Sequence, residues 1–369
     1  MHVCVIGLRG VPNVIGGIEA QCERLYPAIV ANDADVRVTL LIRRGYGPED
    51  RFDFRGTQVL SLWSPFIWGV DTVVHTAWAI LYAWLRLKPD IIHIHGIGPA
   101  FFTPLAWLLR VRTVVTHHAP DYQRPKWGHL GRLFLMTGER LAGRFANRVV
   151  CVSDWLRDDF LQRVPAARRR TVAIRHAGSL DDIATGGSST VLDDLDLEAG
   201  RYLLAVGRLE ATKGFHELVA AFAGAGLDGY KLAIVGSAAG NTAYAEALQE
   251  QAPANVVFAG YRSGADLRQL YEGAALFVHP SHMEGFGLVV AEALSAGIPI
   301  LLSDIPPHRE FGLEPQCYLP VGDVDALTAA LTVQDYSAYL SREAIAHHRT
   351  DWSIAARDHI ALYTAIMAD

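Results

Sequence analysis

Residues 279–299 read HPSHMEGFGLVVAEALSAGIP and decide the fold. The apolar run 275–279 predicts a strand, the small apolar residues of 288–296 predict a helix, and Gly297 ends that helix. Glu284 lies in the connecting loop and Glu292 one turn into the helix. Because a helix N-terminus has unpaired N–H groups and the positive end of the dipole, it can bind an anion. The stretch therefore predicts a site that holds a sugar and a phosphate side by side.

Length and composition indicate a two-domain globular enzyme. A chain of 369 residues exceeds one ordinary core, and 51% hydrophobic with 20% charged residues indicates a well-buried protein. A net charge of −6 argues against nucleic acid as the main partner. The four cysteines form no C-x-x-C pair, so we expect reduced core thiols in a cytosolic protein. Residues 1–6 start a strand at once, which is not the pattern of a signal peptide.

One apolar segment, residues 66–87, could be mistaken for a membrane span. Asp71, His75 and Arg86 interrupt it, and its uninterrupted apolar run is shorter than the roughly 20 residues that a span needs. We expect a helix that is mostly buried in a domain and can touch a membrane surface.

The first half alternates strands with glycine loops and helices. Residues 2–6 and 36–42 predict strands, and residues 18–31 predict a helix. The loop before that helix contains Gly16 and Gly17 but lacks G-x-G-x-x-G spacing, so a dinucleotide fingerprint is absent. A flexible turn is the simpler interpretation, but we expect ligand contact, since such a loop lies at the carboxyl edge of a parallel sheet.

Two further predicted strands, 90–95 and 113–118, contain the pairs His93/His95 and His117/His118. A metal site is the weaker alternative, because no carboxylate or cysteine cluster lies near them in sequence. We expect His93 to be a core histidine with a backbone partner. His118 ends its strand, and we expect a functional role for it.

Residues 124–148 form a basic segment with Glu139 as the lone acid. The apolar side consists of Trp127, Leu130, Leu133, Phe134, Leu141 and Phe145. Such a helix can lie on an anionic membrane. A solvated charged face above a packed apolar stripe explains the pattern equally well. Ser153 after the next strand, 149–153, is expected to cap a helix that starts at Asp154.

Residues 179–200 contain glycines, serines and an acidic run and predict the domain boundary. The pairs Asp33/Asp35, Asp194/Asp196 and Asp323/Asp325 are expected in turns and helix caps, since none follows a buried strand. We therefore predict no catalytic metal and no other cofactor.

The second half repeats the α/β pattern, with strands at 202–206, 231–235, 255–259 and 299–302. Helices are expected at 215–223, 324–331, 337–348 and 352–367. After the first of these strands, Gly207, Arg208, Lys213 and Gly214 form a glycine loop with two cations. Arginine and lysine both bind phosphate oxygens, whereas two solvated loop cations would be the simpler interpretation.

On these motifs the sequence resembles the retaining glycosyltransferases of the GT-B fold, the large family 4 group. Glu284-Gly-Phe-Gly-Leu288 with Glu292 matches its E-x7-E motif, and Gly16-Gly17, Arg208 and Lys213 match its upstream residues. Residues 9–12, 16–19 and 121–128 resemble a bacterial subgroup that includes rhamnosyltransferases of surface-polysaccharide assembly.

The resemblance implies two Rossmann-like domains, 1–180 for the acceptor and 181–350 for the donor, with a C-terminal helix, 351–369, that packs back on the first. Arg208 and Lys213 would hold the donor diphosphate, Glu292 the ribose and Glu284 the transferred sugar. His118 would lie near that sugar. The remaining implied donor contacts are Gly16, Gly17, Gly207, Phe286, Gly287 and Leu288.

The expected reaction is metal-independent transfer of a sugar from a nucleotide-diphosphate donor to a glycan or polyprenyl-linked acceptor hydroxyl, with retention. Double displacement through Glu284 is the second choice. A sugar-nucleotide epimerase, a phosphorylase and a non-catalytic nucleotide-sugar-binding protein remain as alternatives. The expected location is the cytoplasm, with residues 124–148 able to reach the inner face of the plasma membrane.

Overall fold

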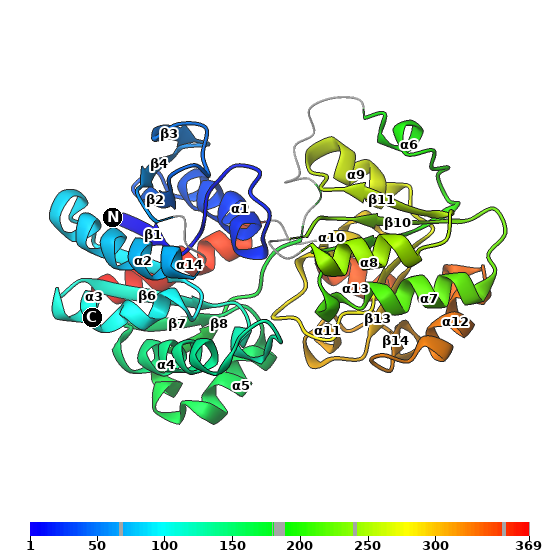
Figure 1. Ribbon diagram of the computed structural model, residues 1–369. Helices are drawn as coiled ribbons and strands as arrows, with labels where there is room; N and C mark the ends of the chain where they lie inside the picture. The colour runs from blue at the N-terminus through cyan, green and yellow to red at the C-terminus, as the bar shows by residue number, and fades with distance from the viewer. Residues whose placement is uncertain (66–68, 179, 181–188, 239–241, 349–351, 369) are drawn as a thin grey trace. The chain divides into compact units, whose positions relative to one another are not determined.

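The computed structural model describes residues 1–65, 69–178, 180, 189–238, 242–348 and 352–368. The chain forms two compact units, residues 1–176 with 352–369, and residues 177–351. The expected boundaries were 180/181 and 350/351, and much of the expected linker, 179–200, lies outside the described residues. Figure 1 labels most of the elements of both units.

The first unit is built on a sheet with the order β3-β4-β2-β1-β5-β6-β7-β8, in which only the β3–β4 pair is antiparallel. Its strands are β1 (His2–Ile6), β2 (Arg37–Arg43), β3 (Arg51–Phe54), β4 (Thr57–Leu62), β5 (Ile91–His95), β6 (Arg112–His117), β7 (Arg148–Cys151) and β8 (Thr171–Ala173). Strands β1 and β5 are buried throughout, as continuous apolar runs predict for a central parallel sheet.

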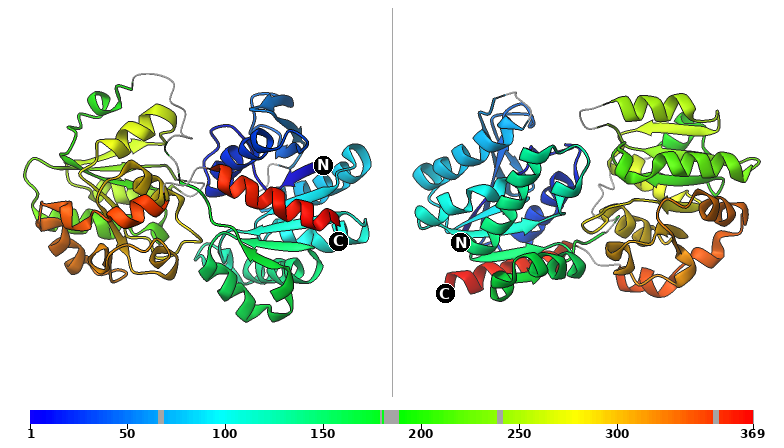
Figure 2. Two further views of the ribbon diagram at one scale, coloured as in Figure 1. Left: turned by 180° about the vertical axis from the view of Figure 1, so that it is seen from behind. Right: turned by 60° about the horizontal axis from the view of Figure 1, so that its bottom comes forward.

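Helices connect these strands. They are α1 (Gly17–Asn32), α2 (Val70–Tyr82), α3 (Thr103–Leu108), α4 (His129–Phe145) and α5 (Asp154–Arg163). Ser153 caps α5 as predicted, since its Oγ accepts the Leu156 N–H at 3.2 Å. The last helix, α14 (Trp352–Ala368), belongs to this unit and packs on α1 (Figure 2).

The prediction of one mostly buried helix across residues 66–87 is wrong. Helix α2 ends at Tyr82 and a π-helical turn covers residues 83–87, while residues 66–68 lie outside the described part. The buried residues of α2 form one stripe around His75. Trp78 in this helix and Leu85 in the turn after it keep 43% and 55% of their surface exposed. A helix on the surface of a sheet can bury only one face, so Trp78 and Trp84 point outward. Among the described residues, every helix is too short or too polar to cross a lipid bilayer.

The second unit has a parallel sheet with the order β11-β10-β9-β12-β13-β14. Its strands are β9 (Tyr202–Val206), β10 (Lys231–Val235), β11 (Val256–Gly260), β12 (Leu276–His279), β13 (Ile300–Ser303) and β14 (Tyr318–Leu319). Its helices are α6 (Val191–Asp194), α7 (Phe215–Ala225), α8 (Ala243–Gln251), α9 (Gly264–Glu272), α10 (Leu288–Ala296), α11 (Pro306–Arg309), α12 (Val324–Thr332) and α13 (Arg342–His348). The helix predicted over 337–348 is two elements, because a 3-10 turn at Tyr336–Tyr339 precedes α13.

The strand order puts the two predicted loops of this unit beside each other. Strand β9 pairs with β12, so the loops after Val206 and after His279 leave the same edge of the sheet. Helix α10 begins and ends as predicted, with Gly297 in the left-handed conformation at its C-terminus. The carboxyl edge of a parallel sheet is the usual ligand site of such folds.

The four cysteines are free and buried, as predicted. Two of the three Asp-x-Asp pairs serve as cap and turn groups, as predicted: Asp323 accepts the Ala326 N–H at 2.9 Å, and Asp33 accepts the Asp35 N–H at 2.9 Å. In the third pair, Asp196 instead accepts a hydrogen bond from Lys231 Nζ at 2.6 Å.

Candidate active site

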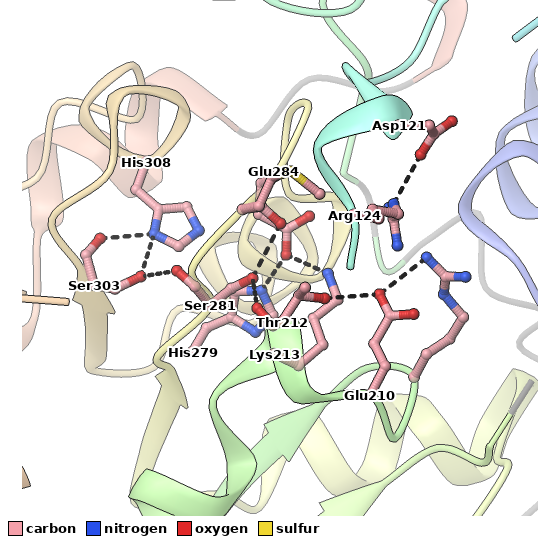
Figure 3. Close-up of polar contacts among 12 residues, drawn as sticks. Asp121, Arg124, Glu210, Thr212, Lys213, His279, Ser281, Glu284, Ser303 and His308 are labelled. Atoms are coloured by element: carbon pink, nitrogen blue, oxygen red, sulfur yellow. Dashed lines mark hydrogen bonds and ion pairs between the residues drawn. The ribbon is translucent and has the colours of Figure 1, made fainter. Parts of the chain in front are cut away.

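The loops after β9 and β12 bring Lys213, Glu284 and His279 together in the second unit (Figure 3). Lys213 Nζ donates to Glu284 Oε1 at 2.5 Å, and His279 Nε2 donates to the same oxygen at 2.6 Å. The side chains of Lys213 and Glu284 are only 11% and 12% exposed. Lys213 is therefore not a solvated loop cation, but half of a nearly buried ion pair.

The protonation of this cluster follows from its contacts. Burial alone raises the pKa of Glu284, but the Lys213 charge and the His279 hydrogen bond outweigh it and hold that pKa well below the ordinary value. Burial lowers the pKa of His279, so its ring is neutral and its Nε2–H is a donor. Glu284 is thus an ionised carboxylate whose Oε1 is fixed and whose Oε2 makes no hydrogen bond among the described residues.

Backbone hydrogen bonds join the two loops that hold this cluster. The Thr212 carbonyl accepts the His282 N–H at 2.9 Å and the Ser281 hydroxyl at 3.1 Å. Ser303 at the end of β13 in turn donates to the Ser281 carbonyl. Gly214 has φ +69°, and a Cβ there would lie 2.3 Å from the Pro280 carbonyl oxygen. The close approach of the two loops therefore requires glycine at 214.

Arg208 lies in the loop after β9 and contacts Glu210, with 3.3 Å between Nη2 and Oε1. Gly207 begins this loop and bonds through its N–H to the Val235 carbonyl at 2.9 Å. The structure therefore brings a guanidinium and an ammonium into one glycine loop, each already near a carboxylate. Arginine offers a planar fork of donors that matches phosphate oxygens.

Helix α10 begins directly after the glutamate loop. Gly287 precedes it with φ +103°, a conformation that favours glycine, and Leu288 is its first residue. Phe286 is buried against Phe311. The first N–H groups of an α-helix have no partners within the helix, so this terminus can accept an anion.

Glu292 lies in the first half of α10 and is 5% exposed. Tyr271, from α9, donates its hydroxyl to Glu292 Oε2 at 2.9 Å. Sequence reasoning found Glu292 but missed Tyr271, because no local pattern links residues 21 positions apart.

The first unit contains the other predicted residues. Gly16 and Gly17 begin α1, and the loop before them is fixed by Arg9, whose Nε donates to Glu19 Oε1 at 2.9 Å. A Cβ at Gly17 would meet no atom within 4 Å, so the space beside it is open.

His118 follows β6 and is partly exposed, and its Nε2 lies 3.0 Å from Nδ1 of the buried His95. His93 is a core histidine as predicted, but its expected backbone partner is wrong. Its ring nitrogens contact the hydroxyls of Tyr26, Tyr363 and Thr116 instead. Side chains of a strand point away from the ladder to the two faces of the sheet, so His93 meets side chains of α1, α14 and the neighbouring β6.

Across the described residues, one group of side chains has metal-ligand geometry: His279, Glu284 and His308, with ligand atoms within 4.8 Å of one another. Lys213 Nζ contacts the same carboxylate at 2.5 Å, and its positive charge opposes a second cation there. The histidines of β5 and β6 belong to no such group.

Two family models match the chain. "Glycosyltransferase Family 4" matches residues 15–177, and "Glycosyl transferases group 1" matches residues 194–332. A glycogen synthase of Mycobacterium tuberculosis is 28% identical over 417 residues, covering 99% of this chain and 95% of that protein. A GDP-mannose:cellobiosyl-diphosphopolyprenol alpha-mannosyltransferase of Komagataeibacter xylinus is 27% identical, and the match covers 75% of this chain and 72% of that protein.

Solved structures share the fold over the whole chain. Sucrose-phosphate synthase of Thermosynechococcus elongatus superposes with a TM-score of 0.81 at 20% identity, covering 100% of this chain and 99% of that one. Anabaena HepE in complex with UDP-glucose superposes with a TM-score of 0.77 at 20% identity, and the match covers 99% of this chain and 100% of that one. The matches favour a glycosyltransferase over the epimerase, phosphorylase and non-catalytic alternatives. The fold, the two family matches and the relatives together identify the chain as a glycosyltransferase with the GT-B fold.

Proposed function

We propose that this protein transfers a sugar from a nucleotide-diphosphate donor to a hydroxyl of a glycan or lipid-linked acceptor, with retention of the anomeric configuration. The observation that carries the proposal is the cluster of Lys213, Glu284 and His279 beside the N-terminus of α10. This edge of the sheet offers cations and helix N–H groups for a diphosphate, and an ionised carboxylate for sugar hydroxyls.

The geometry of the second unit supports each proposed donor contact. Arg208 and Lys213 bind the diphosphate, and the backbone of Phe286, Gly287 and Leu288 contacts sugar and phosphates. Glu284 accepts a sugar hydroxyl at Oε2, since Oε1 already has two donors.

Glu292 binds the ribose hydroxyls, oriented by the Tyr271 hydroxyl. Gly207 begins the phosphate loop. In the first unit, Gly16, Gly17 and His118 are the proposed contacts to the donor and its sugar, and the open space beside Gly17 supports this.

The fixed position of Glu284 supports departure of the diphosphate and attack by the acceptor on the same face of the sugar. The cations and the helix N-terminus stabilise the charge that develops on the leaving diphosphate, and its oxygen takes the acceptor proton. Double displacement would need Glu284 as nucleophile, but a carboxylate that is strongly stabilised as an anion by Lys213 and His279 is a weak one.

The test is a panel of nucleotide diphosphate sugars scored by thermal shift and by donor hydrolysis without acceptor. We expect one sugar nucleotide to raise the melting temperature and to be hydrolysed slowly. Arg208→Ala should lose this shift, whereas Arg268→Ala, which removes a surface ion pair with Glu272, should keep it. A panel without shift or turnover, or an unaltered shift in Arg208→Ala, would refute the proposal.

The catalysis is proposed to be independent of metal, because Lys213 already neutralises the carboxylate of the His279–Glu284–His308 group. Transfer should continue at an unchanged rate in EDTA. A loss of activity that Mn²⁺ or Mg²⁺ restores would show instead that a cation takes the place of Lys213.

The first unit is proposed to bind an anionic membrane surface. It contains 24 Lys and Arg against 16 Asp and Glu, a net charge of +8, whereas the second unit contains 9 against 23, a net charge of −14. Helix α4 buries Leu135 and Glu139 but leaves Leu130 and Leu133 exposed at 84% and 57%. The exposed leucines support the membrane alternative over a packed apolar stripe.

A second part of this surface lies at the C-terminal end of α4. Trp107 and Leu108 are 59% and 70% exposed, and a pocket of about 230 Å³ beside Trp107 is lined by Arg144, Arg148 and Arg170. Arginines next to exposed apolar side chains suit the phosphates and acyl chains of an anionic lipid.

Vesicles of anionic and of neutral phospholipid test this surface. We expect binding to anionic vesicles only, weakened by salt. Leu133→Glu should reduce it several-fold, whereas Val333→Glu, with the same 57% exposure but in the acidic unit, should not. Equal binding to neutral vesicles, or a concentration-dependent dimer that Leu133→Glu abolishes, would contradict a membrane partner.

A further inference from the structure

A chain of buried polar groups runs behind His118 in the first unit. His118 Nε2 lies 3.0 Å from His95 Nδ1, and His95 Nε2 lies 2.5 Å from the Tyr26 hydroxyl. The Tyr26 and Tyr363 hydroxyls bond each other and lie 3.0 and 2.6 Å from His93 Nδ1. This chain of polar side chains links β5, β6, α1 and the C-terminal helix α14.

This chain of hydrogen-bonded side chains ends at Thr116, whose Oγ1 lies 2.7 Å from His93 Nε2. Thr116, His93, His95, Tyr26 and Tyr363 are all 0% exposed. The partly exposed His118 is therefore the one member of the chain that can meet a ligand.

Every imidazole in this chain is neutral. Burial lowers the pKa of His93 and His95 well below the ordinary value, and the neighbouring rings lower it further. Burial also lowers the pKa of His118 to about 3, with His117 adding to the effect. A neutral imidazole has one N–H donor and one acceptor nitrogen, so each ring passes the direction of hydrogen bonding to the next.

Two directions connect all the groups, and Thr116 distinguishes them. In the first direction, the Thr116 hydroxyl donates to His93 Nε2, and His93 Nδ1–H donates to the Tyr363 hydroxyl. The Tyr363 hydroxyl then donates to the Tyr26 hydroxyl, which donates to His95 Nε2. Then His95 Nδ1–H donates to His118 Nε2, and every donor has an acceptor.

In the reverse direction the hydroxyl of Thr116 accepts from His93. Its own proton then has no acceptor among the described residues, since the Thr116 side chain contacts only His93 there. A buried donor without an acceptor keeps the full cost of its desolvation, so the first direction is preferred.

We propose that this buried chain fixes His118 as the Nδ1–H tautomer, so that His118 presents a hydrogen-bond donor to the ligand and not a general base. Thr116 and Tyr26 act through His95 and are positioning residues. His118 Nδ1 makes no hydrogen bond among the described residues and is the atom left for a ligand oxygen. An N–H at this atom suits a sugar hydroxyl or a developing anionic oxygen, and this last point rests on the proposed function.

Long-range ¹H–¹⁵N spectra of ring-¹⁵N-histidine-labelled protein test the tautomer directly. The His118 signals are assigned by their loss in His118→Gln. In the unaltered protein we expect the Nδ1–H tautomer to exceed the Nε2–H tautomer about tenfold or more. The Nε2–H tautomer would leave the buried Thr116 hydroxyl without an acceptor. A predominant Nε2–H form would overturn the proposal.

Three variants separate the chain from general effects of folding. Thr116→Val keeps the shape but removes the hydroxyl, so both tautomers should appear in comparable amounts, and Thr116→Ser should restore Nδ1–H. Tyr26→Phe breaks the chain next to His95 and should also mix the tautomers. Tyr336→Phe, a buried tyrosine of the second unit, should change nothing. An unchanged Nδ1–H signal in both Thr116→Val and Tyr26→Phe would refute the assignment.

Transfer kinetics separate this inference from the proposed function. With a donor found by thermal shift, Thr116→Val should lower kcat about twofold without changing the donor-induced shift, because about half of the molecules then lack the Nδ1–H donor. Thr116→Ser should restore kcat. An unchanged kcat in Thr116→Val with mixed tautomers would show that the donor role is wrong. If no donor is found, the proposed function fails, while the spectra still decide the tautomer.

Discussion

The two units gather opposite kinds of polar groups at the carboxyl edges of their sheets. At β9 and β12 the second unit holds an ammonium and a carboxylate, Lys213 and Glu284, at 2.5 Å. At β5 and β6 the first unit holds neutral rings and hydroxyls that end at His118. The difference supports two proposed roles: the charged edge binds charge on a ligand, whereas the neutral edge fixes the direction of a single hydrogen bond.

Removal of the cation should have the largest effect. Lys213→Ala removes a diphosphate contact and leaves Glu284 without its counter-ion, so we expect transfer to slow by about 10²–10³-fold. The control is Lys231→Ala, which loses a surface pair with Asp196 and should keep its rate. Near-normal transfer in Lys213→Ala would show that the charged edge does not meet the diphosphate.

The first unit also contains a buried carboxylate, and we predict that it serves stability and not transfer. Burial raises the pKa of Glu139, but hydrogen bonds from His117 and Arg163 outweigh it and lower the pKa from 4.5 to about 2. Because the folded pKa is depressed, this stabilisation is complete above about pH 4.5 and is lost as the pH falls towards 2.

The expected loss is about 3 kcal/mol of unfolding free energy, measured by denaturant titration from pH 6 to 2.5. Glu139→Gln should lack this part of the pH dependence and keep its transfer rate at pH 7. An identical pH profile in the two proteins would contradict the assignment.

The joined loops of the second unit can be tested at Gly214. Gly214→Ala places a Cβ 2.3 Å from the Pro280 carbonyl and strains a residue with φ +69°, so we expect a destabilisation of about 3 kcal/mol. Gly226 has φ +57° with open space around it, and Gly226→Ala should cost about 1 kcal/mol by strain alone. Equal melting temperatures in the two variants would show that the loops separate without cost.

The smallest effect is expected at Tyr271. Tyr271→Phe removes the hydroxyl that donates to Glu292 Oε2 and should cost about 1 kcal/mol of stability, with a several-fold rise in KM for the donor. Kinetics at varied donor concentration measure this. A change in kcat with constant KM would contradict the ribose role of Glu292.

Local patterns in the sequence determined most of the elements. The apolar runs of β1, β9 and β10 and the small-residue helix α10 ended within a residue or two of the predicted positions. Glycines set these limits, as Ser153 sets the start of α5, through local backbone preferences that depend on neighbouring residues only. The same loops contained Arg208, Lys213 and Glu284, so the sequence was sufficient to predict the charged edge.

The partners of these residues depended on the tertiary structure. The Tyr363 hydroxyl reaches His93 across 270 residues, and Tyr26 reaches His95 across 69. These contacts follow from the order of the strands and from α14 packing on α1, which no window of sequence encodes. A hydrophobic period also does not say which of two apolar stripes is buried, so the exposure of Leu130 was decided only by packing. The sequence thus determined which groups are present at each edge, and the fold decided which of them are paired, neutral or exposed.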